Sequence, residues 1–273
     1  MPGPTSTATG SQSGLRKEVV LEKGKIVGAV SVAIDILEYL ARQPQPVGVT
    51  RIAGDLGLNA STTFNTLKTL AAHDYVVFQE ASKTYRIGFG LLHVARSVAG
   101  QNQEFEVMRA ELEAIATRHQ VTLAVWRPLR IDRKVLIYSF QPAGSLGIRI
   151  QMSLGQRLPL LVGSSGRLFA AFGALDRAER ERQFSQIRWQ RPLTFEAFEA
   201  EVDEARRLGH SVDEGNYVRG TAMISIPIFD AEHKAVMAIS AMMFIQQYEE
   251  ADHSALIADV KAVAAQLSRL RGL

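Results

Sequence analysis

Residues 51–70 read R-I-A-G-D-L-G-L-N-A-S-T-T-F-N-T-L-K-T-L, and they carry the strongest structural signal in the chain. Apolar residues at helical spacing predict a short helix over residues 49–56 and a longer one over 60–73. Gly57 permits a tight turn between them, and the small side chain of Ala53 permits close packing of the second helix. Asn59 and Ser61 are both suitable N-caps for that helix. The segment therefore predicts a helix-turn-helix.

The flanking segments extend this unit to residues 26–88. Helical spacing predicts a preceding helix over residues 30–41, which is followed by prolines. Two β-rich runs, residues 75–78 and 85–87, flank a polar turn and predict a hairpin. Three short helices followed by a hairpin are the element order of a winged helix-turn-helix.

The helix over residues 60–73 is expected to bury one face and expose the other. The buried face is expected to hold Phe64, Leu67, Leu70 and Ala71. The exposed polar residues are Thr62, Thr63, Asn65, Thr66, Lys68 and Thr69. Short hydroxyls and an amide near a helix N-terminus suit contacts with DNA phosphates and base edges. The alternative is a three-helix packing module that has no role in binding DNA.

Composition limits the class of protein. A length of 273 residues predicts about two domains, and 47% apolar with 22% charged residues excludes a wholly disordered chain. The absence of cysteine excludes a disulfide scaffold, a thiol nucleophile and a cysteine-ligated zinc. Residues 1–100 contain 10 Lys and Arg against 7 Asp and Glu, whereas residues 101–273 contain 21 of each. The net charge of +3 therefore lies in the N-terminal part, which weakly indicates a polyanionic partner there.

The chain ends and apolar runs give two further expectations. Residues 1–25 are rich in Gly, Ser, Thr and Pro and are predicted to be a disordered tail. They contain no apolar segment typical of a secretory signal, and no charge-free stretch reaches the roughly 18 residues of a membrane span. We therefore expect a cytoplasmic protein with no membrane partner.

A linker helix over residues 89–102 is expected to lead into a second domain, residues 103–273. Its pattern predicts strands over residues 121–127, 134–140, 148–152, 223–229 and 235–244. It predicts helices over residues 104–119, 164–172, 176–187, 195–208 and 254–270. Strands joined by short polar turns favour an antiparallel sheet flanked by helices, so the fold class is α+β with a sensor-like second domain.

A candidate ligand site lies in this second domain. Ser164 and Ser165 open a predicted helix, where free N–H groups and two hydroxyls would favour an anion such as a carboxylate. Hydroxyls and adaptable methionines alternate on two neighbouring strands: Thr221, Met223, Ser240 and Met242. Such a pocket would suit a small organic acid, aromatic acids included. The alternative is that the methionines fill the core and the serines cap a helix.

The sequence gives little support for catalysis or a cofactor. Gly163-Ser164-Ser165-Gly166 departs from the G-x-S-x-G nucleophile motif, because Arg167 occupies the last position. The six histidines are scattered, and no phosphate-binding or dinucleotide-binding motif is present. We expect no enzyme activity, no cofactor and no metal site.

Taken together, these motifs resemble those of the isocitrate-lyase-regulator (IclR) family of bacterial transcription factors, in the right order from residue 26 onward. The N-terminal motifs are A-I-D-I-L-E-Y-L-A (33–41), R-I-A-G-D-L-G-L (51–58), S-T (61–62), L-K-T-L (67–70), D-Y-V (74–76) and Y-R-I-G (85–88). The C-terminal motifs are G-Q-R-L-P-L (155–160), G-S-S-G (163–166), L-G-H-S-V-D-E-G (208–215) and R-G-T-A-M-I-S-I-P-I-F-D (219–230).

The resemblance implies a winged helix-turn-helix DNA-binding domain, a linker helix and a GAF-like α/β effector-binding domain, assembled as a homodimer or a dimer of dimers. The effector positions that match the family are Ser164, Ser165, Asp213, Thr221, Met223, Ser240 and Met242. Ala60 and Asn65 stand where the family often has Lys and Arg, so phosphate contacts are expected to shift to other basic residues. The candidate DNA-binding residues are Arg51, Ser61, Thr62, Thr63, Asn65, Thr66, Lys68 and Lys83.

These features predict a ligand-responsive regulator, repressor or activator, that binds operator DNA and a small organic acid and controls a catabolic operon. The alternative is a DNA-binding regulator whose C-terminal domain only oligomerises and binds no ligand.

Overall fold

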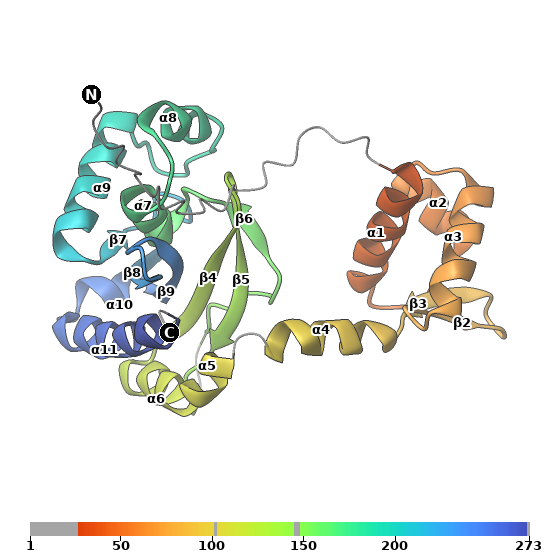
Figure 1. The fold of residues 1–273 in the computed structure, drawn as a ribbon, viewed down its shortest axis with the longest axis horizontal. Helices are drawn as coiled ribbons and strands as arrows, with labels where there is room; N and C mark the ends of the chain where they lie inside the picture. Colours follow the sequence, from red (N-terminus) through yellow and green to blue (C-terminus); the bar gives the residue numbers. More distant parts are fainter. Residues whose placement is uncertain (1–26, 101–102, 145–147, 272–273) are drawn as a thin grey trace, which may run out of the picture. The chain divides into compact units, whose positions relative to one another are not determined.

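The structure is a computed structural model that describes residues 27–100, 103–144 and 148–271. The chain divides into two compact units, residues 1–101 and 102–273 (Figure 1). The tail predicted over residues 1–25 lies outside the described residues.

The N-terminal unit is a winged helix-turn-helix, as predicted. Its elements are α1 (Gly28–Ala41), β1 (Val47–Gly48), α2 (Val49–Leu56), α3 (Ala60–Ala72), β2 (Val76–Gln79), β3 (Thr84–Ile87) and α4 (Gly90–Gly100). The three helices α1, α2 and α3 enclose a core that includes Ile36, Leu40, Ile52, Leu67, Val76 and Tyr85. The wing has three antiparallel strands in the order β1-β3-β2. Strand β1 was not predicted, because two residues are too few to show a strand pattern.

Local sequence explains the turn between α2 and α3. Gly57 ends α2 with a φ of 64°, a left-handed conformation that glycine adopts without the strain a Cβ would introduce. Asn59, rather than Ser61, is the N-cap of α3, and its side-chain oxygen accepts a hydrogen bond from the Ser61 N–H at 2.9 Å. These two residues fix where α3 begins.

The C-terminal unit is an α+β domain built on one six-stranded sheet. Its elements are α5 (Gln103–Val107), α6 (Arg109–His119), β4 (Thr122–Arg130), β5 (Arg133–Phe140), β6 (Arg157–Pro159), α7 (Gly163–Phe172), α8 (Arg177–Ser185), α9 (Phe195–Leu208), β7 (Ser211–Asp213), β8 (Thr221–Phe229), β9 (Ala235–Phe244), α10 (Ile245–Glu249) and α11 (Ser254–Arg271). The strand order is β6-β5-β4-β9-β8-β7, and neighbouring strands are antiparallel.

Each face of this sheet carries its own core. Along β9, Met237, Ile239 and Ala241 belong to the core that contains residues of α5, α6 and α11. The alternate residues Ala238 and Met242 belong to the core that contains residues of α7, α8 and α9. Helix α7 packs on β7, β8 and β9 and against α9 (Figure 1). The domain is therefore a sheet with helices on both faces, and α7 lies on the face described below.

Two predictions for this domain were wrong. Residues 148–152 form no strand. Ile150 and Met152 pack against the core that contains residues of α7, α8 and α9, while Ile148 is exposed. The apolar alternation of this segment therefore comes from covering the sheet rather than from pairing with it. The helix predicted over residues 104–119 is divided at Met108 into α5 and α6. Among the described residues, no helix is long and apolar enough to cross a membrane.

Candidate DNA-binding face and ligand cavity

Helix α3 buries Leu67 and Leu70 as predicted, but Thr63 rather than Phe64 completes its buried face. Thr63 is fully buried with Leu67 and Leu70, and its Oγ1 donates to the Asn59 carbonyl oxygen at 3.0 Å. Phe64 is 48% exposed. The buried face therefore runs through positions 63, 67 and 70, and these fit helical spacing as well as the predicted positions 64, 67 and 71 do. The prediction that Phe64 is buried and Thr63 exposed was wrong, and a buried Thr63 cannot contact DNA.

The exposed face of α3 keeps most of the predicted polar residues. Ser61, Thr62, Asn65 and Lys68 are exposed, and their side chains make no hydrogen bond to another described residue. Thr66 is half-buried, and its Oγ1 donates to the Thr62 carbonyl oxygen at 2.9 Å. The first four side chains thus retain donors for an external partner, whereas the Thr66 hydroxyl proton is used inside the helix.

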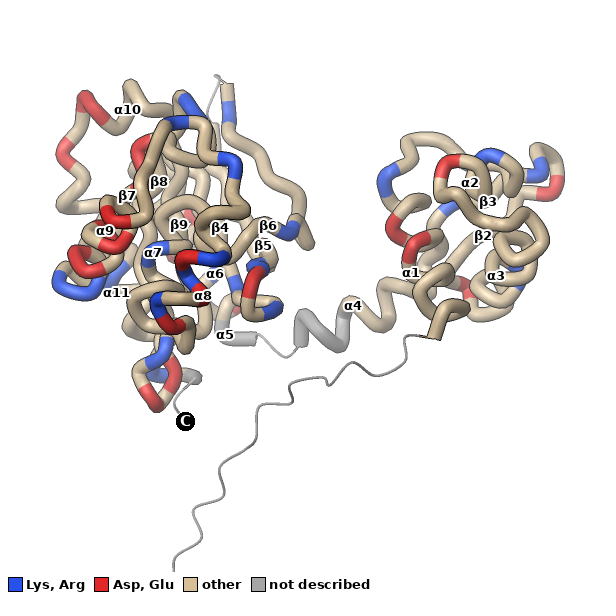
Figure 2. The backbone as a smooth tube through the Cα atoms, turned by 90° about the horizontal axis from the view of Figure 1, so that it is seen from above, with Lys and Arg blue, Asp and Glu red and all other residues tan. Residues whose placement is uncertain are grey.

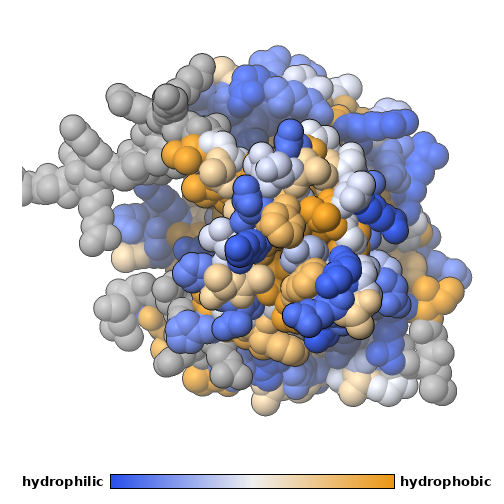
Figure 3. All heavy atoms as spheres, turned by 90° about the vertical axis from the view of Figure 1, so that its right-hand side faces the viewer, coloured by the Kyte–Doolittle hydropathy of each residue, from blue (hydrophilic) through white to orange (hydrophobic). Residues whose placement is uncertain are grey.

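Two further candidate cations lie on elements next to α3, namely α2 and the wing. Arg51, on α2, forms an exposed ion pair with Asp55 at 3.5 Å, which is weak enough for a phosphate to compete with it. Lys83 occupies the turn of the wing with a φ of 54°, and its Nζ lies 5.7 Å from the centroid of the Phe78 ring. Figure 3 views the N-terminal domain from the side on which α3 lies in Figure 1, and apolar surface is exposed there among hydrophilic side chains.

The charge of this domain is lower than the sequence total suggests. Residues 1–26 contain 4 of the 10 Lys and Arg and 2 of the 7 Asp and Glu, so residues 27–100 retain 6 and 5, a net charge of +1. Figure 2 shows acidic and basic positions interspersed along the backbone of both units. The side chains of α3, rather than net charge, therefore carry the case for a DNA-binding face.

A cavity of about 240 Å³ lies between α7 and the sheet of the C-terminal domain. Four of the predicted effector residues line it: Ser165, Thr221, Met223 and Met242. Met223 and Met242 are direct cross-strand partners on β8 and β9. The rest of the wall is largely apolar and includes Trp126, Ile150, Met152 and Leu158. Its size and lining suit a small, partly apolar ligand.

Lys134 is a cavity residue that the sequence analysis missed. It is 2% exposed, and its Nζ donates to the Ser165 Oγ at 2.6 Å and to the Val162 carbonyl oxygen. Its Nζ also lies 5.3 Å from the centroid of the Trp126 ring. Burial, together with the nearby charge of Arg167, lowers the pKa of Lys134 to about 7, although the charge of Asp213 opposes the shift. The sequence did contain a signal for its burial, because strand alternation places Lys134 on the same side of β5 as the buried Leu136.

Two predicted effector residues, Ser164 and Ser240, do not line the cavity. Both are fully buried, and each hydroxyl lies 2.6 Å from the hydroxyl of Ser225 on β8. Ser211 on β7 adds a hydrogen bond to the Ser164 carbonyl oxygen at 2.7 Å. These serines attach the start of α7 to the sheet, and Ser164 does not cap the helix, which has no side-chain cap.

Asp213 was also predicted to contact the effector, but it faces a buried arginine instead. Its Oδ2 accepts a hydrogen bond from Arg167 at 2.7 Å, and its Oδ1 accepts the N–H groups of Gly215 and Asn216 at 3.1 Å. Arg167 also donates to Glu201 at 2.8 Å. Arg167 and Asp213 are both buried, so this network connects α7, α9 and β7.

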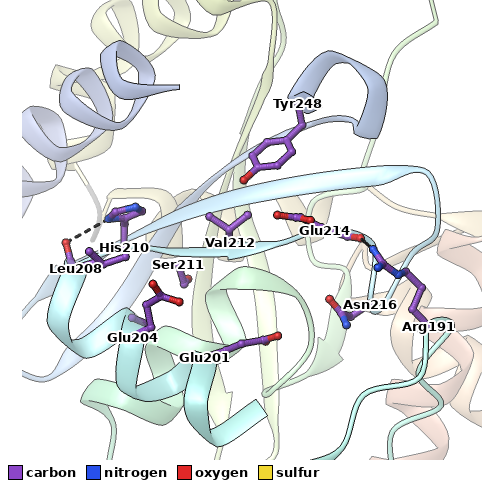
Figure 4. A pocket seen from close by; sticks show the side chains of 11 residues that line it. Arg191, Glu201, Glu204, Leu208, His210, Ser211, Val212, Glu214, Asn216 and Tyr248 are labelled. Carbon is purple, nitrogen blue, oxygen red and sulfur yellow. Dashed lines mark hydrogen bonds between the residues drawn. The ribbon is translucent and has the colours of Figure 1, made fainter. Parts of the chain in front are cut away.

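A second hollow, of about 400 Å³, lies beside α9 and β7 (Figure 4). Its lining is polar and includes Glu201, Glu204, Glu214 and Tyr248. Burial raises the pKa of Tyr248, and the neighbouring charge of Glu214 raises it further.

Within the described part of the chain, no three His, Asp or Glu residues converge as metal ligands.

Comparison with known proteins identifies the family. Residues 105–269 match the family described as bacterial transcriptional regulator IclR C-terminal, and residues 29–80 match the IclR helix-turn-helix domain. The chain therefore belongs to the IclR family of bacterial transcriptional regulators.

Curated relatives and solved structures agree with this assignment. The chain is 24% identical to the DNA-binding transcriptional repressor YiaJ of Escherichia coli K12 over 93% of its own length and 92% of YiaJ. It is 28% identical to the repressor AllR of the same organism over 82% of each. An IclR regulator from Alicyclobacillus acidocaldarius superposes with a TM-score of 0.75 at 25% identity, over 90% of this chain and 100% of that one.

An IclR homologue from Microbacterium hydrocarbonoxydans, solved with 4-hydroxybenzoate, shares the fold. Its TM-score is 0.71 at 16% identity, over 88% of this chain and 98% of that one. YiaJ and AllR are both named as transcriptional repressors.

Proposed function

We propose that this protein is a ligand-responsive repressor or activator that binds operator DNA through α3 and controls a catabolic operon. The observation that carries the proposal concerns four exposed residues on the third helix of a winged helix-turn-helix: Ser61, Thr62, Asn65 and Lys68. Their side chains make no hydrogen bond within the described part of the chain. In this fold the third helix enters the major groove with its N-terminal half near the bases. Arg51 and Lys83 would contact phosphates from either side. Because operator DNA is the partner, the proposed place of action is the cytoplasm.

The cavity of the C-terminal domain is the proposed effector site, and the proposed effector is a small organic acid, aromatic acids included. Ser165, Thr221, Met223 and Met242 supply two hydroxyls and two adaptable apolar walls. The related Microbacterium protein binds 4-hydroxybenzoate, which makes that acid a reasonable first probe. If the C-terminal domain only oligomerises, Ser165→Ala will change neither acid binding nor DNA binding.

The proposed assembly is a homodimer or a dimer of dimers, which would read a near-palindromic operator. Phe89, just before α4, is 76% exposed, and Leu92 and Val94 on that helix are about half exposed. An exposed apolar surface of this kind favours contact with a second copy of the chain. Sedimentation of the purified chain tests the assembly directly.

Selection of binding sites from a random duplex library, followed by mobility shifts at fixed salt, tests the DNA-binding proposal. We expect one enriched sequence, bound at least tenfold more tightly than random DNA, with binding weakened by Thr62→Ala or Asn65→Ala. Gln186→Ala, which alters an exposed amide in the other domain, is the matched control. Failure to enrich any sequence would support the packing-module alternative.

The Ser165–Lys134 contact needs a separate test, because serine hydrolases can use lysine as the general base. We expect no turnover of p-nitrophenyl acetate by the purified chain. Turnover that Ser165→Ala abolishes would contradict a purely regulatory role.

A further inference from the structure

The cavity beneath α7 contains a buried cation with no anion beside it. Lys134 is 2% exposed, and no Asp or Glu of the described chain lies within ion-pair distance of its ammonium group. Its hydrogen-bond partners, the Val162 carbonyl and the Ser165 hydroxyl, are neutral oxygens. A buried charge without a counter-charge is costly, so this one calls for a partner.

The other buried cation nearby, Arg167, takes up the neighbouring carboxylates. Arg167 is neutralised by Asp213 and Glu201, both at 2.7 Å, and it also donates to the Gly163 carbonyl oxygen. Those two carboxylates are therefore already committed. Asp213 acts on Lys134 only at longer range, so a direct ion-pair partner for this lysine has to come from outside the described chain.

The N-terminus of α7 adds a second source of positive charge at the cavity. Val162, Gly163 and Ser165 line the cavity, and α7 begins with no side-chain cap. The first N–H groups of a helix have no acceptor within the helix, and its N-terminus carries partial positive charge. This environment disfavours a bare lysine cation and favours an anion placed between the cation and the helix.

The remaining wall restricts the body of that anion. Trp126, Met152, Leu158, Met223 and Met242 surround the cavity, and Lys134 is the one basic residue among those that line it. A second carboxylate on the ligand would be desolvated against these side chains with nothing to pair with. The cavity thus matches one charge on an apolar body.

We propose that Lys134 is the specificity-determining residue of this cavity, and that its ammonium group pairs with the carboxylate of a monocarboxylic acid that has an apolar body. The Ser165 hydroxyl would then donate to the same carboxylate. The inference rests on the proposed function only in treating the cavity as the effector site; acid binding itself does not require DNA.

The test is calorimetric titration of the full chain at pH 6.5 with paired probes. The acids are benzoate, 4-hydroxybenzoate, cyclohexanecarboxylate and 3-methylbutanoate, each compared with its primary amide, and the dicarboxylates are succinate and phthalate. We expect at least one monocarboxylate to bind roughly tenfold or more tightly than its amide, as for hydrogen bonds to charged groups. The dicarboxylates should bind more weakly than that acid.

Lys134→Met, which keeps an unbranched side chain one atom shorter and without the charge, should remove this preference by weakening acid binding roughly tenfold or more. The matched control is Lys261→Met, because Lys261 also donates to a backbone oxygen, that of Leu208 at 2.9 Å, but lies outside the cavity. If Lys134→Met does not fold, as judged by circular dichroism, the wild-type chain decides the matter. Its affinity for the acid, but not for the amide, should fall between pH 6.5 and pH 9.

Three results would overturn the inference: no acid in the panel binds, acid and amide bind alike, or Lys134→Met folds and binds the acid unchanged. The two proposals can fail separately. Acid binding that depends on Lys134 without any sequence-specific DNA binding would contradict the regulator and keep the inference. Specific DNA binding without acid selectivity would keep the regulator and contradict the inference about Lys134.

Discussion

At the scale of single residues, the C-terminal domain treats its two buried cations differently. Arg167 has carboxylate partners from two elements, whereas Lys134 has only neutral oxygens. The folded domain therefore supplies carboxylates that neutralise Arg167, whereas a carboxylate for Lys134 would come from a ligand. This contrast separates a residue that holds the fold from one that recognises a ligand.

Removing the partner of Arg167 should destabilise the domain strongly. Asp213→Ala leaves a fully buried guanidinium with Glu201 as its one remaining carboxylate among the described residues and deprives two backbone N–H groups of their acceptor. We expect a loss of roughly 3–5 kcal/mol in the free energy of unfolding, measured with urea. The double variant Arg167→Met/Asp213→Leu should recover part of it. A loss below about 1 kcal/mol would mean that the network is not a stabilising one.

Acid binding should depend on pH through Lys134. Burial lowers the pKa of this lysine to about 7, so it is protonated below that pH and increasingly neutral above it, while a carboxylic acid stays ionised throughout. Affinity for the acid should therefore be highest below pH 7 and fall by up to about tenfold per pH unit above it. Calorimetry from pH 6 to 9 measures this, and an affinity that rises over the same range would contradict it.

Phe64 should influence which bases α3 prefers. Nearly half of its surface is exposed on the helix proposed to enter the major groove, where an apolar side chain can contact the methyl group of thymine. Phe64→Ala should leave the domain folded but abolish a preference for thymine at one selected position. Replacing that thymine with uracil should weaken wild-type binding roughly fourfold, the value of one buried methyl-sized group, and leave the variant unaffected. Equal wild-type affinity for both duplexes would exclude this contact.

At the scale of elements, α7 is the piece on which the cavity depends, and its approach to the preceding chain requires glycine. A Cβ at Gly166 would lie 2.1 Å from the carbonyl carbon and oxygen of Leu161, which are backbone atoms and cannot move aside. The small Ser164 meanwhile lies against Ser225 on the sheet. The G-S-S-G motif is therefore explained by close packing as well as by the cavity it borders.

Gly166→Ala should consequently be destabilising. We expect a loss of about 1–3 kcal/mol in the free energy of unfolding, together with weaker acid binding, because the helix must shift away from Leu161. Gly54→Ala is the matched control: it is also a helical glycine, and its Cβ would meet nothing within 4 Å. It should be neutral or slightly stabilising. Equal effects of the two substitutions in urea unfolding would contradict the packing argument.

The sequence predicted long, strongly patterned elements well and short or irregular ones poorly. The ends of α2, α9 and β9 agree with prediction, because Gly57 and Gly209 terminate the helices and a polar turn precedes the strand. Strands β1 and β7, with two and three residues, are too short to show alternation. Residues 148–152 alternate because they cover a core rather than pair in the sheet.

The candidate site was predicted in part, for a related reason. Alternation on β8 and β9 predicted that Thr221, Met223 and Met242 face the same side, and all three line one cavity. Ser240 faces that side too but bonds to Ser225 instead, and alternation alone cannot distinguish these two environments. Asp213 and Arg167 are paired across 46 residues of sequence, a contact that no local pattern reveals. On α3, two helical stripes fit the apolar residues, and packing selected the one through Thr63.

At the scale of the whole molecule, two compact units share one chain: a winged helix-turn-helix and a sheet domain with a ligand-sized cavity. A regulator of the proposed kind requires that occupancy of the cavity changes the affinity of the DNA-binding unit. Coupling between two sites in one protein typically amounts to 1–3 kcal/mol, or about 5–150-fold in affinity. It is reciprocal, so the operator must change the affinity for the acid by the same factor.

The decisive measurement is the affinity of the full chain for its selected operator, by fluorescence anisotropy at fixed salt and pH 6.5, with and without a saturating acid identified by calorimetry. We expect the acid to change the affinity of the wild-type chain by at least about fivefold, and its amide to change it by much less. Lys134→Met should bind the operator normally and no longer respond to the acid. An acid that saturates the cavity and leaves operator affinity unchanged would contradict the account.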